Sequence, residues 1–295
     1  ILPLQLKCHY LHFFFIILLL FFELKSRGGK NFSTLKATSQ YLQTFRPRGI
    51  RKVSNYFIVL LPIFLGFLFP VIILFSNMIG SISNESFWRS VLISVNTFSI
   101  AGISAITIMT TATLLGTLNY ILRNRHISFL TNLASAGYAF PGTMLAIGVI
   151  IFIGQLESIS NFLFSKVIGL PLSIYLSGTI AVLLFAYLVR YLAVGYGSIV
   201  SGLQNIPYNL NFASRTLGSS MENTIRRITI PLLSRFILAG SILVFVDIVK
   251  ELPMTLLLRP FNFETLATYT YQFAHDELKE QASMPALIII LVSII

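Results

Sequence analysis

Cysteine is almost absent from this 295-residue sequence, which contains only Cys8. A single cysteine excludes an internal disulfide and any CxxC metal site. His9 and His12 have helical i, i+3 spacing but no third ligand nearby, so we predict no metal site. Lys30 ends a Gly-Gly-Lys run that lacks the GxxxxGK[ST] spacing of a phosphate-binding loop. We therefore expect this chain to bind no ATP and no other cofactor.

Charged residues are also scarce, at 11% of the chain, whereas soluble domains have about 25%. No paired carboxylates, HExxH helix or GxSxG nucleophile turn occurs. The sequence therefore does not predict an enzyme. A membrane-embedded enzyme stays open as an alternative, but it would need a catalytic constellation outside this stretch.

Apolar residues dominate instead: the chain is 55% hydrophobic and has a mean hydropathy of +0.82. They are gathered in long blocks, as spanning helices of about 20 residues require. Seven blocks are visible, at residues 4–22, 56–79, 91–122, 133–156, 172–200, 236–258 and from 284 onward. We predict an all-α, polytopic transmembrane helical bundle with about six to seven spans.

Basic residues set the predicted topology. The segment 23–52 has eight Lys or Arg residues and one acid, Glu23, which places it in the cytoplasm by the positive-inside rule. Counting crossings from there puts 81–90, 157–170 and 259–283 outside, and 123–128 and 201–235 inside. The net charge of +11 thus belongs to cytoplasmic loops. No basic face with interleaved aromatics suggests a nucleic-acid partner.

The inside loop at 201–235 is the most informative segment. It predicts a short helix from residue 209, a break at Gly218, a second amphipathic helix, and Pro231 before the next span. Met221, Ile225 and Ile228 form an apolar stripe at i, i+4, i+7. Such a helix pair offers an apolar ridge to a cytosolic partner, or lies flat on the bilayer as an interfacial helix; the pattern leaves both open.

This loop resembles the coupling-loop signature of binding-protein-dependent ABC importer permeases. That signature is Glu-Ala-Ala, three residues, Gly, nine residues, Ile, any residue, Leu-Pro. Its spacing is met at Ala213, Gly218, Ile228 and Pro231. Phe212 stands where the family has Glu, and Ser214 where it has the second Ala. The resemblance implies that the loop docks on a separate cytoplasmic ATPase; the missing acid leaves the strength and partner choice of that docking open.

Three further stretches resemble ferric-iron permeases: 135–142, 187–193 and 246–267. The resemblance covers roughly residue 56 to the end. It implies a multi-pass permease of the bacterial inner membrane, lying in lipid and assembled with an ABC ATPase and a periplasmic iron-binding protein. Such permeases often fuse two halves. Residues 1–22 would then be the last helix of an upstream half, 23–52 a basic cytoplasmic linker, and 53–295 a permease domain truncated in its last helix.

Charges inside the apolar blocks mark a candidate translocation path. Asp247, Lys250 and Glu251 fall at i, i+3, i+4 on one face of the predicted helix, just before Pro253. Buried charges in membranes usually face the bundle interior or a water-filled cavity. The group is either a self-neutralising structural cluster or a net-negative lining for a cation. Arg190 is either a partner for one of these acids or a residue of the path.

These features together predict the permease subunit of an ATP-driven importer that works by alternating access, with ferric iron as the expected solute. The same machine with thiamine, a polyamine or sulfate is one alternative; acids near the path speak mildly against sulfate. An ATP-independent carrier or channel is another alternative.

Overall fold

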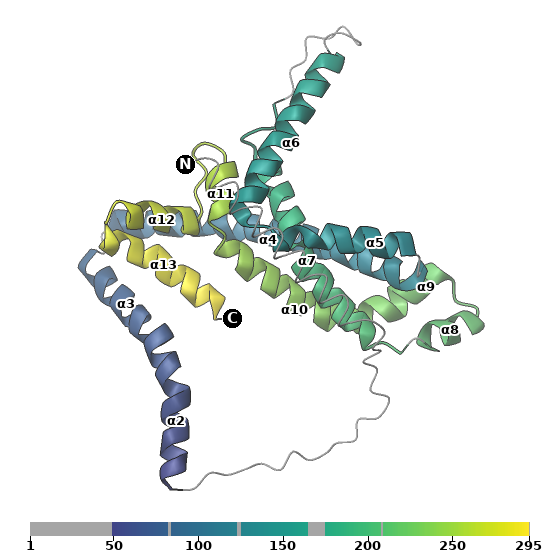
Figure 1. The fold of residues 1–295 in the computed structure, drawn as a ribbon, viewed down its shortest axis with the longest axis horizontal. Helices are drawn as coiled ribbons and strands as arrows, with labels where there is room; N and C mark the ends of the chain where they lie inside the picture. Colours follow the sequence, from purple (N-terminus) through teal and green to yellow (C-terminus); the bar gives the residue numbers. More distant parts are fainter. Residues whose placement is uncertain (1–48, 82–83, 123–124, 165–174, 208, 295) are drawn as a thin grey trace, which may run out of the picture. The chain divides into compact units, whose positions relative to one another are not determined.

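The computed structural model describes residues 49–81, 84–122, 125–164, 175–207 and 209–294. All of them belong to one compact unit, Arg48–Ile295. These described residues are helical and contain no strand (Figure 1), so the predicted all-α fold is confirmed. The predicted helix at 1–22 and nearly all of the linker at 23–52 lie outside the described residues.

The first described helical segment is continuous and apolar, and it is made of α2 (Ile50–Ile63), the π-turn η1 (Phe64–Leu68) and α3 (Phe69–Ser81). Pro70 has no N–H, and in a regular helix its ring would meet the carbonyl four residues earlier. The π-turn ends just before this proline. No residue of α2 is buried, and an apolar helix with such a surface is stable in lipid.

Three helices form the core: α4 (Asn84–Leu122), α7 (Ile180–Gln204) and α10 (Ile230–Val249) pack against one another. Met109 of α4 lies where all three meet. A Cβ on Gly195 would be 3.1 Å from its sulfur, and a Cβ on Gly240 would be 2.7 Å from its terminal methyl group. Close approach at small residues is how helices hold together in lipid, where no hydrophobic force drives them together.

The predicted single span at 133–156 is wrong, because the helix is interrupted. α5 (Arg125–Ala134) is followed by the 3-10 turn η2 (Ser135–Ala139), and α6 starts afresh as Gly142–Phe162. Phe140 between them is extended, with ψ 140°, since Pro141 disfavours the helical region for the residue before it. The predicted inside loop at 123–128 is correspondingly helical from Arg125.

The predicted span at 236–258 is wrong for a similar reason. α10 ends at Val249, and α11 (Pro253–Leu258) begins at a proline, which suits a first helical position because it needs no N–H partner there. The predicted outside loop at 259–283 also holds more structure than expected. It contains α12 (Leu266–His275) and the start of α13 (Lys279–Ser293).

Five segments of the described residues are long and apolar enough to cross a membrane: Ile50–Gly80, Ser86–Leu122, Gly142–Phe162, Ile180–Gln204 and Met221–Val249. Of the seven predicted spans, the first lies outside the described residues and the last corresponds to α13, of 15 residues.

Two of the three predicted outside segments lie together, and so do the regions of the two predicted inside loops. Ser86 and Glu280, from two predicted outside segments, line one pocket together with Asn77 at the end of a predicted span. Tyr120 and Phe212, beside and within the predicted inside loops, line another. For these two pairs of segments, the packing agrees with the sides that the charge pattern predicts.

Candidate functional site

The loop around Gly218 folds as a short helix, a tight turn and the start of a second helical segment, so the predicted break at Gly218 is present. α8 (Asn209–Thr216) ends in a Schellman motif: Ser219 donates its N–H to the Ser214 carbonyl at 3.1 Å, and Gly218 donates to the Arg215 carbonyl at 3.0 Å. Gly218 has φ +84° and open space around the position of a Cβ. The glycine of the signature is thus required by backbone conformation rather than by lack of room.

The second helix is capped and tied to the first. Ser220 is the N-cap of α9 (Met221–Thr224), and its hydroxyl accepts the N–H of Asn223. The hydroxyls of Ser214 and Thr224 lie 2.9 Å apart and are buried between the helices. The angle between α8 and α9 is therefore fixed by a turn, a cap and a buried hydrogen bond.

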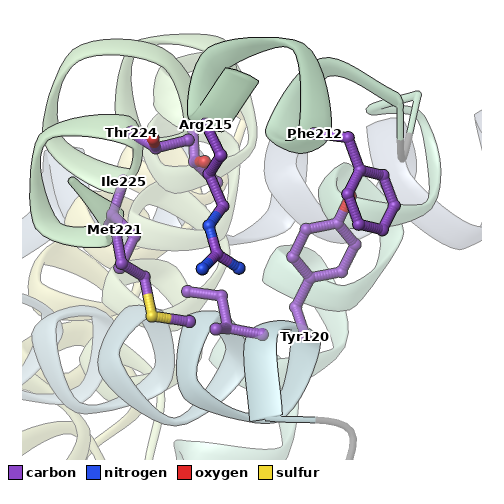
Figure 2. A pocket seen from close by; sticks show the side chains of 8 residues that line it. Tyr120, Phe212, Arg215, Met221, Thr224 and Ile225 are labelled. Atoms are coloured by element: carbon purple, nitrogen blue, oxygen red, sulfur yellow. The ribbon is translucent and has the colours of Figure 1, made fainter. Parts of the chain in front are cut away.

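Figure 2 shows the cavity between this helix pair and the end of α4. Phe212 and Tyr120 both line it, and the Arg215 guanidinium points into it (Figure 2). Phe212 is also 52% exposed. The position where the family has an acid thus presents an apolar ring, part of it on the surface of α8.

The predicted stripe of Met221, Ile225 and Ile228 does not stay on one face. Met221 and Ile225 line the cavity with Tyr120, whereas Ile228 lines a separate pocket together with Ala213 and Gly218. The cause is the π-turn η4 (Ile225–Thr229), which shifts the helical phase.

Pro231 does not separate two helices, contrary to the prediction. η4 ends just before it, and Ile230 donates its N–H to the Ile225 carbonyl. The π-turn accommodates the proline, so that Met221–Val249 is one continuous helical segment. Ile228 and Pro231 of the signature therefore belong to the same rod, Met221–Val249, as the core helix α10.

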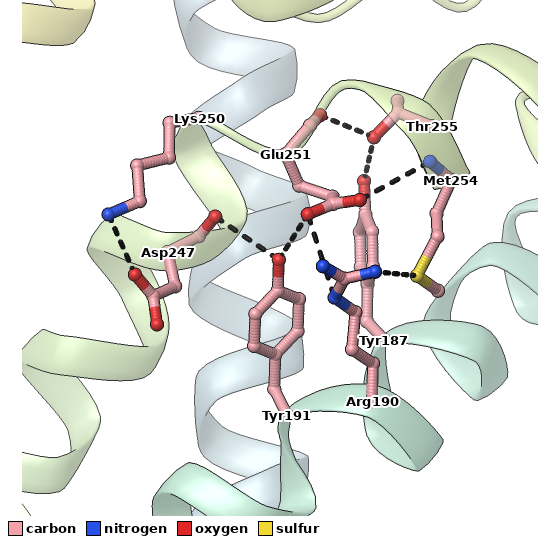
Figure 3. Close-up of polar contacts among 8 residues, drawn as sticks. All are labelled: Tyr187, Arg190, Tyr191, Asp247, Lys250, Glu251, Met254 and Thr255. Atoms are coloured by element: carbon pink, nitrogen blue, oxygen red, sulfur yellow. Dashed lines mark hydrogen bonds and ion pairs between the residues drawn. The ribbon is translucent and has the colours of Figure 1, made fainter. Parts of the chain in front are cut away.

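A cluster of polar side chains lies at the other end of this rod, where α10 ends (Figure 3). Glu251 is 6% exposed. Its Oε2 accepts a hydrogen bond from the Tyr191 hydroxyl and lies 3.8 Å from Arg190 Nε, and its Oε1 accepts the N–H of Met254 at 3.3 Å. Of the two acids weighed as a partner for Arg190, the structure thus selects Glu251.

The break between α10 and α11, residues 250–252, is also attached to α7 through its backbone. Thr255 donates its hydroxyl proton to the Glu251 carbonyl at 2.7 Å. Tyr187 therefore donates to the Thr255 oxygen, at 2.6 Å. Tyr187 and Tyr191, one helical turn apart on α7, hold opposite ends of the α10–α11 connection (Figure 3).

Arg190 contacts both helix interruptions, the one between α5 and α6 and the one between α10 and α11. Its guanidinium carbon is 6.0 Å from the centre of the Tyr138 ring in η2 and 5.7 Å from that of Tyr191. A Cβ on Gly142, the first residue of α6, would overlap Arg190 Nη1. The three stretches that resemble ferric-iron permeases thus meet at one arginine.

Asp247 and Lys250 form a separate, more exposed pair, 2.8 Å apart with side-chain exposures of 21% and 56%. The prediction that they share a helical face with Glu251 is wrong, because the helix ends at Val249 and Pro253 starts the next one. With Arg190 included, two acids face two bases. The pairing of each acid with one base fits the self-neutralising cluster, one of the two interpretations that the sequence left open.

Residues 128–295 match the family described as "binding-protein-dependent transport system inner membrane component". The chain belongs to this family. Members are membrane components of transport systems, so the chain is a multi-pass transport component rather than an enzyme.

A curated relative of this transport component is the Fe(3+)-transport system permease protein FbpB 2 of Haemophilus influenzae. It is 27% identical over 115 residues, which make up 39% of this chain and 23% of that protein. The chain thus matches less than a quarter of the relative's length.

Solved structures share the fold of this transport component. The bacterial alginate ABC transporter in complex with a pentasaccharide-bound periplasmic protein has a chain with a TM-score of 0.66 at 16% identity. The match covers 83% of this chain and 93% of the other. The inward-facing MetNI methionine ABC transporter gives 0.51 at 16% identity, over 72% and 95% of the two chains.

Sequence reasoning missed four residues of this transport component: Gly142, Tyr187, Tyr191 and Thr255. Pro141 and Pro253 were the local signals for the two helix interruptions that bring them to Arg190. No group of three His, Cys, Asp or Glu residues suited to a metal occurs in the described part of the chain; His9 and His12 lie outside it.

Proposed function

We propose that this chain is the permease subunit of an ATP-driven importer, and that residues 212–231 dock on a separate cytoplasmic ATPase. The observation that carries the proposal is the fixed helix pair around Gly218. Its Schellman turn and its buried Ser214–Thr224 contact make a preformed ridge. A helix that only lies on a bilayer needs no such second helix, so the geometry favours docking on a protein.

In the proposed mechanism, the rod Met221–Val249 transmits movement through the membrane domain. ATP binding by the partner moves the helix pair, and the rod transmits this movement to the break that carries Lys250 and Pro253. In this proposal the helices that carry Asp247 to Pro253 then change the side of the membrane to which the translocation path opens. Asp247 and Lys250 remain the candidate lining of the path, since they are the more exposed charged pair.

Ferric iron is the solute we propose. Support comes from the Haemophilus influenzae relative and from the three resembling stretches, which meet at Arg190. The formal charges of the two acids, Asp247 and Glu251, and of the two bases, Lys250 and Arg190, sum to zero. They therefore favour neither a cationic nor an anionic solute. Thiamine, a polyamine and sulfate therefore remain alternatives within the same machine, and an ATP-independent carrier or channel remains an alternative to it.

The proposed assembly contains the ABC ATPase, a periplasmic binding protein that delivers solute to the outside loops, and a second permease half, fused upstream or separate. It lies in the bacterial inner membrane. The chain itself binds no cofactor in this proposal, and ATP is used by its partner. Residues 53–295 form the permease domain.

The test is uptake of radiolabelled ferric iron by cells that contain the full-length protein, its ATPase and its binding protein. Unlabelled thiamine, spermidine and sulfate serve as competitors. We expect ATP-dependent uptake that Gly218→Pro abolishes, because proline cannot adopt the positive φ of residue 218. Gly148→Ala, in open space on α6, should keep the parent rate.

Each other result has a distinct meaning. If an ATPase copurifies but iron is not taken up, the permease assignment stands and ferric iron is not the solute. If no ATPase copurifies and uptake persists without ATP, the carrier or channel alternative is correct. If Gly218→Pro transports normally, the loop is not the lever.

A further inference from the structure

Side-chain hydrogen bonds from α7 hold the end of the rod at and beside the break between α10 and α11. The regular hydrogen-bond ladder of α10 stops at Val249, and α11 starts again at Pro253. Between them, Glu251 is held by the Tyr191 hydroxyl on one oxygen and by the Met254 N–H on the other. The same carboxylate therefore joins α7 to both sides of the interruption.

The attachment is incompletely paired on the arginine side. Arg190 Nε is buried and has no hydrogen-bond partner among the described residues. Its distance of 3.8 Å from Glu251 Oε2 is beyond hydrogen-bond length. Glu251, in contrast, has a hydrogen bond on each carboxylate oxygen. Tyr191, rather than Arg190, makes the direct link from α7 to the carboxylate in this conformation.

The rod crosses α7 closely before it reaches this link. A Cβ on Gly202 would lie 2.7 Å from side-chain atoms of both Leu233 and Phe236. Ser198 donates its hydroxyl proton to the Phe236 carbonyl at 2.8 Å. We expect a rigid helix held at such a crossing to turn about the crossing point. Movement at Met221 would then displace the other end, at Val249, and with it the nearby Glu251.

We propose that Tyr191, Arg190 and Glu251 form a latch that closes the α10–α11 break against α7, and that ATP-driven movement of the rod opens it. Tyr191 and Arg190 are positioning residues in this assignment: they act on Glu251 and do not contact the solute. The proposal rests on the proposed function, because the movement that opens the latch comes from a docked ATPase.

Hydrogen–deuterium exchange of the full-length protein tests the latch directly. Tyr191→Phe removes only the hydroxyl, which binds Glu251 and also lies 3.4 Å from the Asp247 carbonyl oxygen. We expect the amides of residues 250–252 and 254–256 to exchange roughly threefold to tenfold faster in this variant, the change produced by losing one typical hydrogen bond. Tyr196→Phe is the matched control, since its hydroxyl on the same helix binds Asn119 instead. It should exchange like the parent at the same residues.

ATP hydrolysis by the copurified assembly separates a latch from a merely structural bond. In the parent, hydrolysis should depend on the periplasmic binding protein. In Tyr191→Phe and Glu251→Gln, hydrolysis without the binding protein should rise until this dependence is largely lost. Tyr196→Phe should keep it.

Faster exchange together with lost dependence supports the proposal. Parent-like exchange in both Tyr191→Phe and Glu251→Gln would overturn it, as would faster exchange with the dependence on the binding protein intact. If no ATPase copurifies, the proposed function and the ATP-driven opening both fail. The exchange contrast between Tyr191→Phe and Tyr196→Phe would then still decide whether Tyr191 closes the break.

Discussion

The Ser214 hydroxyl lies 2.9 Å from the Thr224 hydroxyl, buried across the turn at Gly218. The two residues come from different helices and are ten positions apart. Thr224 also donates its proton to the Ser220 carbonyl at 3.0 Å, so Ser214 is the donor in the bond between the hydroxyls. The position where the family has alanine is therefore used here as a hydrogen-bond donor.

Removing the two hydroxyls should have unequal effects. Ser214→Ala leaves Thr224 bound to Ser220 and should cost about 1 kcal/mol of stability. Thr224→Val leaves Ser214 buried without its partner and removes a second bond, so its cost should be larger, roughly 2 kcal/mol. Thermal unfolding of the purified full-length protein measures both. Equal effects would show that the hydroxyls are not coupled.

Gly218 should tolerate substitution in the order Asn, Ala, Pro. Asparagine adopts positive φ comparatively easily, whereas alanine in the left-handed region costs roughly 1–2 kcal/mol. Proline also removes the N–H that binds the Arg215 carbonyl. The measure is the amount of ATPase that copurifies with each variant: near-parent for Gly218→Asn, reduced for Gly218→Ala and absent for Gly218→Pro. A Gly218→Asn variant as defective as Gly218→Pro would show that φ is not the property that matters.

The Arg190–Glu251 pair should behave as a coupled unit in unfolding experiments. Glu251→Gln leaves the partly buried guanidinium, whose side chain is 18% exposed, without its counter-charge and should cost roughly 3 kcal/mol, the low end for a buried pair. Arg190→Gln leaves the carboxylate with the Tyr191 and Met254 bonds, so we expect a smaller loss. The double variant Arg190→Gln, Glu251→Gln should be more stable than Glu251→Gln alone. Strict additivity would mean that the two charges do not interact.

The coupling loop was predictable because its determinants are local. A glycine after a short helix, a serine cap and a fixed spacing to Pro231 lie within about two dozen residues, and the structure has the predicted break at Gly218. What the local pattern missed is the π-turn, which lets the helix continue through Pro231. Sequence periodicity assumes a constant helical phase, so it placed Ile228 on the same face as Met221.

The junction at Arg190 was only partly predictable, because its contacts join residues that are far apart in the chain. Buried charge requires compensation, so a partner for Arg190 was expected. Tyr191 is 60 positions from Glu251, and no spacing rule brings them together. Treating 236–258 as one helix also put Asp247 and Glu251 on one face. The apolar composition hid the interruption, although Pro253 signalled it.

Gly142 and Gly148 lie on the same helix, α6, and should respond in opposite ways to alanine. A Cβ on Gly142 would overlap the Arg190 guanidinium, while a Cβ on Gly148 meets nothing within 4 Å. Gly142→Ala should therefore cost about 1–3 kcal/mol through overpacking. Gly148→Ala should be neutral or stabilise by up to roughly 1 kcal/mol, because alanine favours the helix.

A third variant identifies the cause of the Gly142→Ala effect. If the new methyl group acts by displacing the guanidinium, it should cost much less in an Arg190→Gln background, where the shorter side chain leaves room. Thermal unfolding of the four combinations gives this coupling directly. An unchanged cost in the Arg190→Gln background would contradict the packing of α6 on Arg190. Gly142 would then matter only for the backbone at the start of the helix.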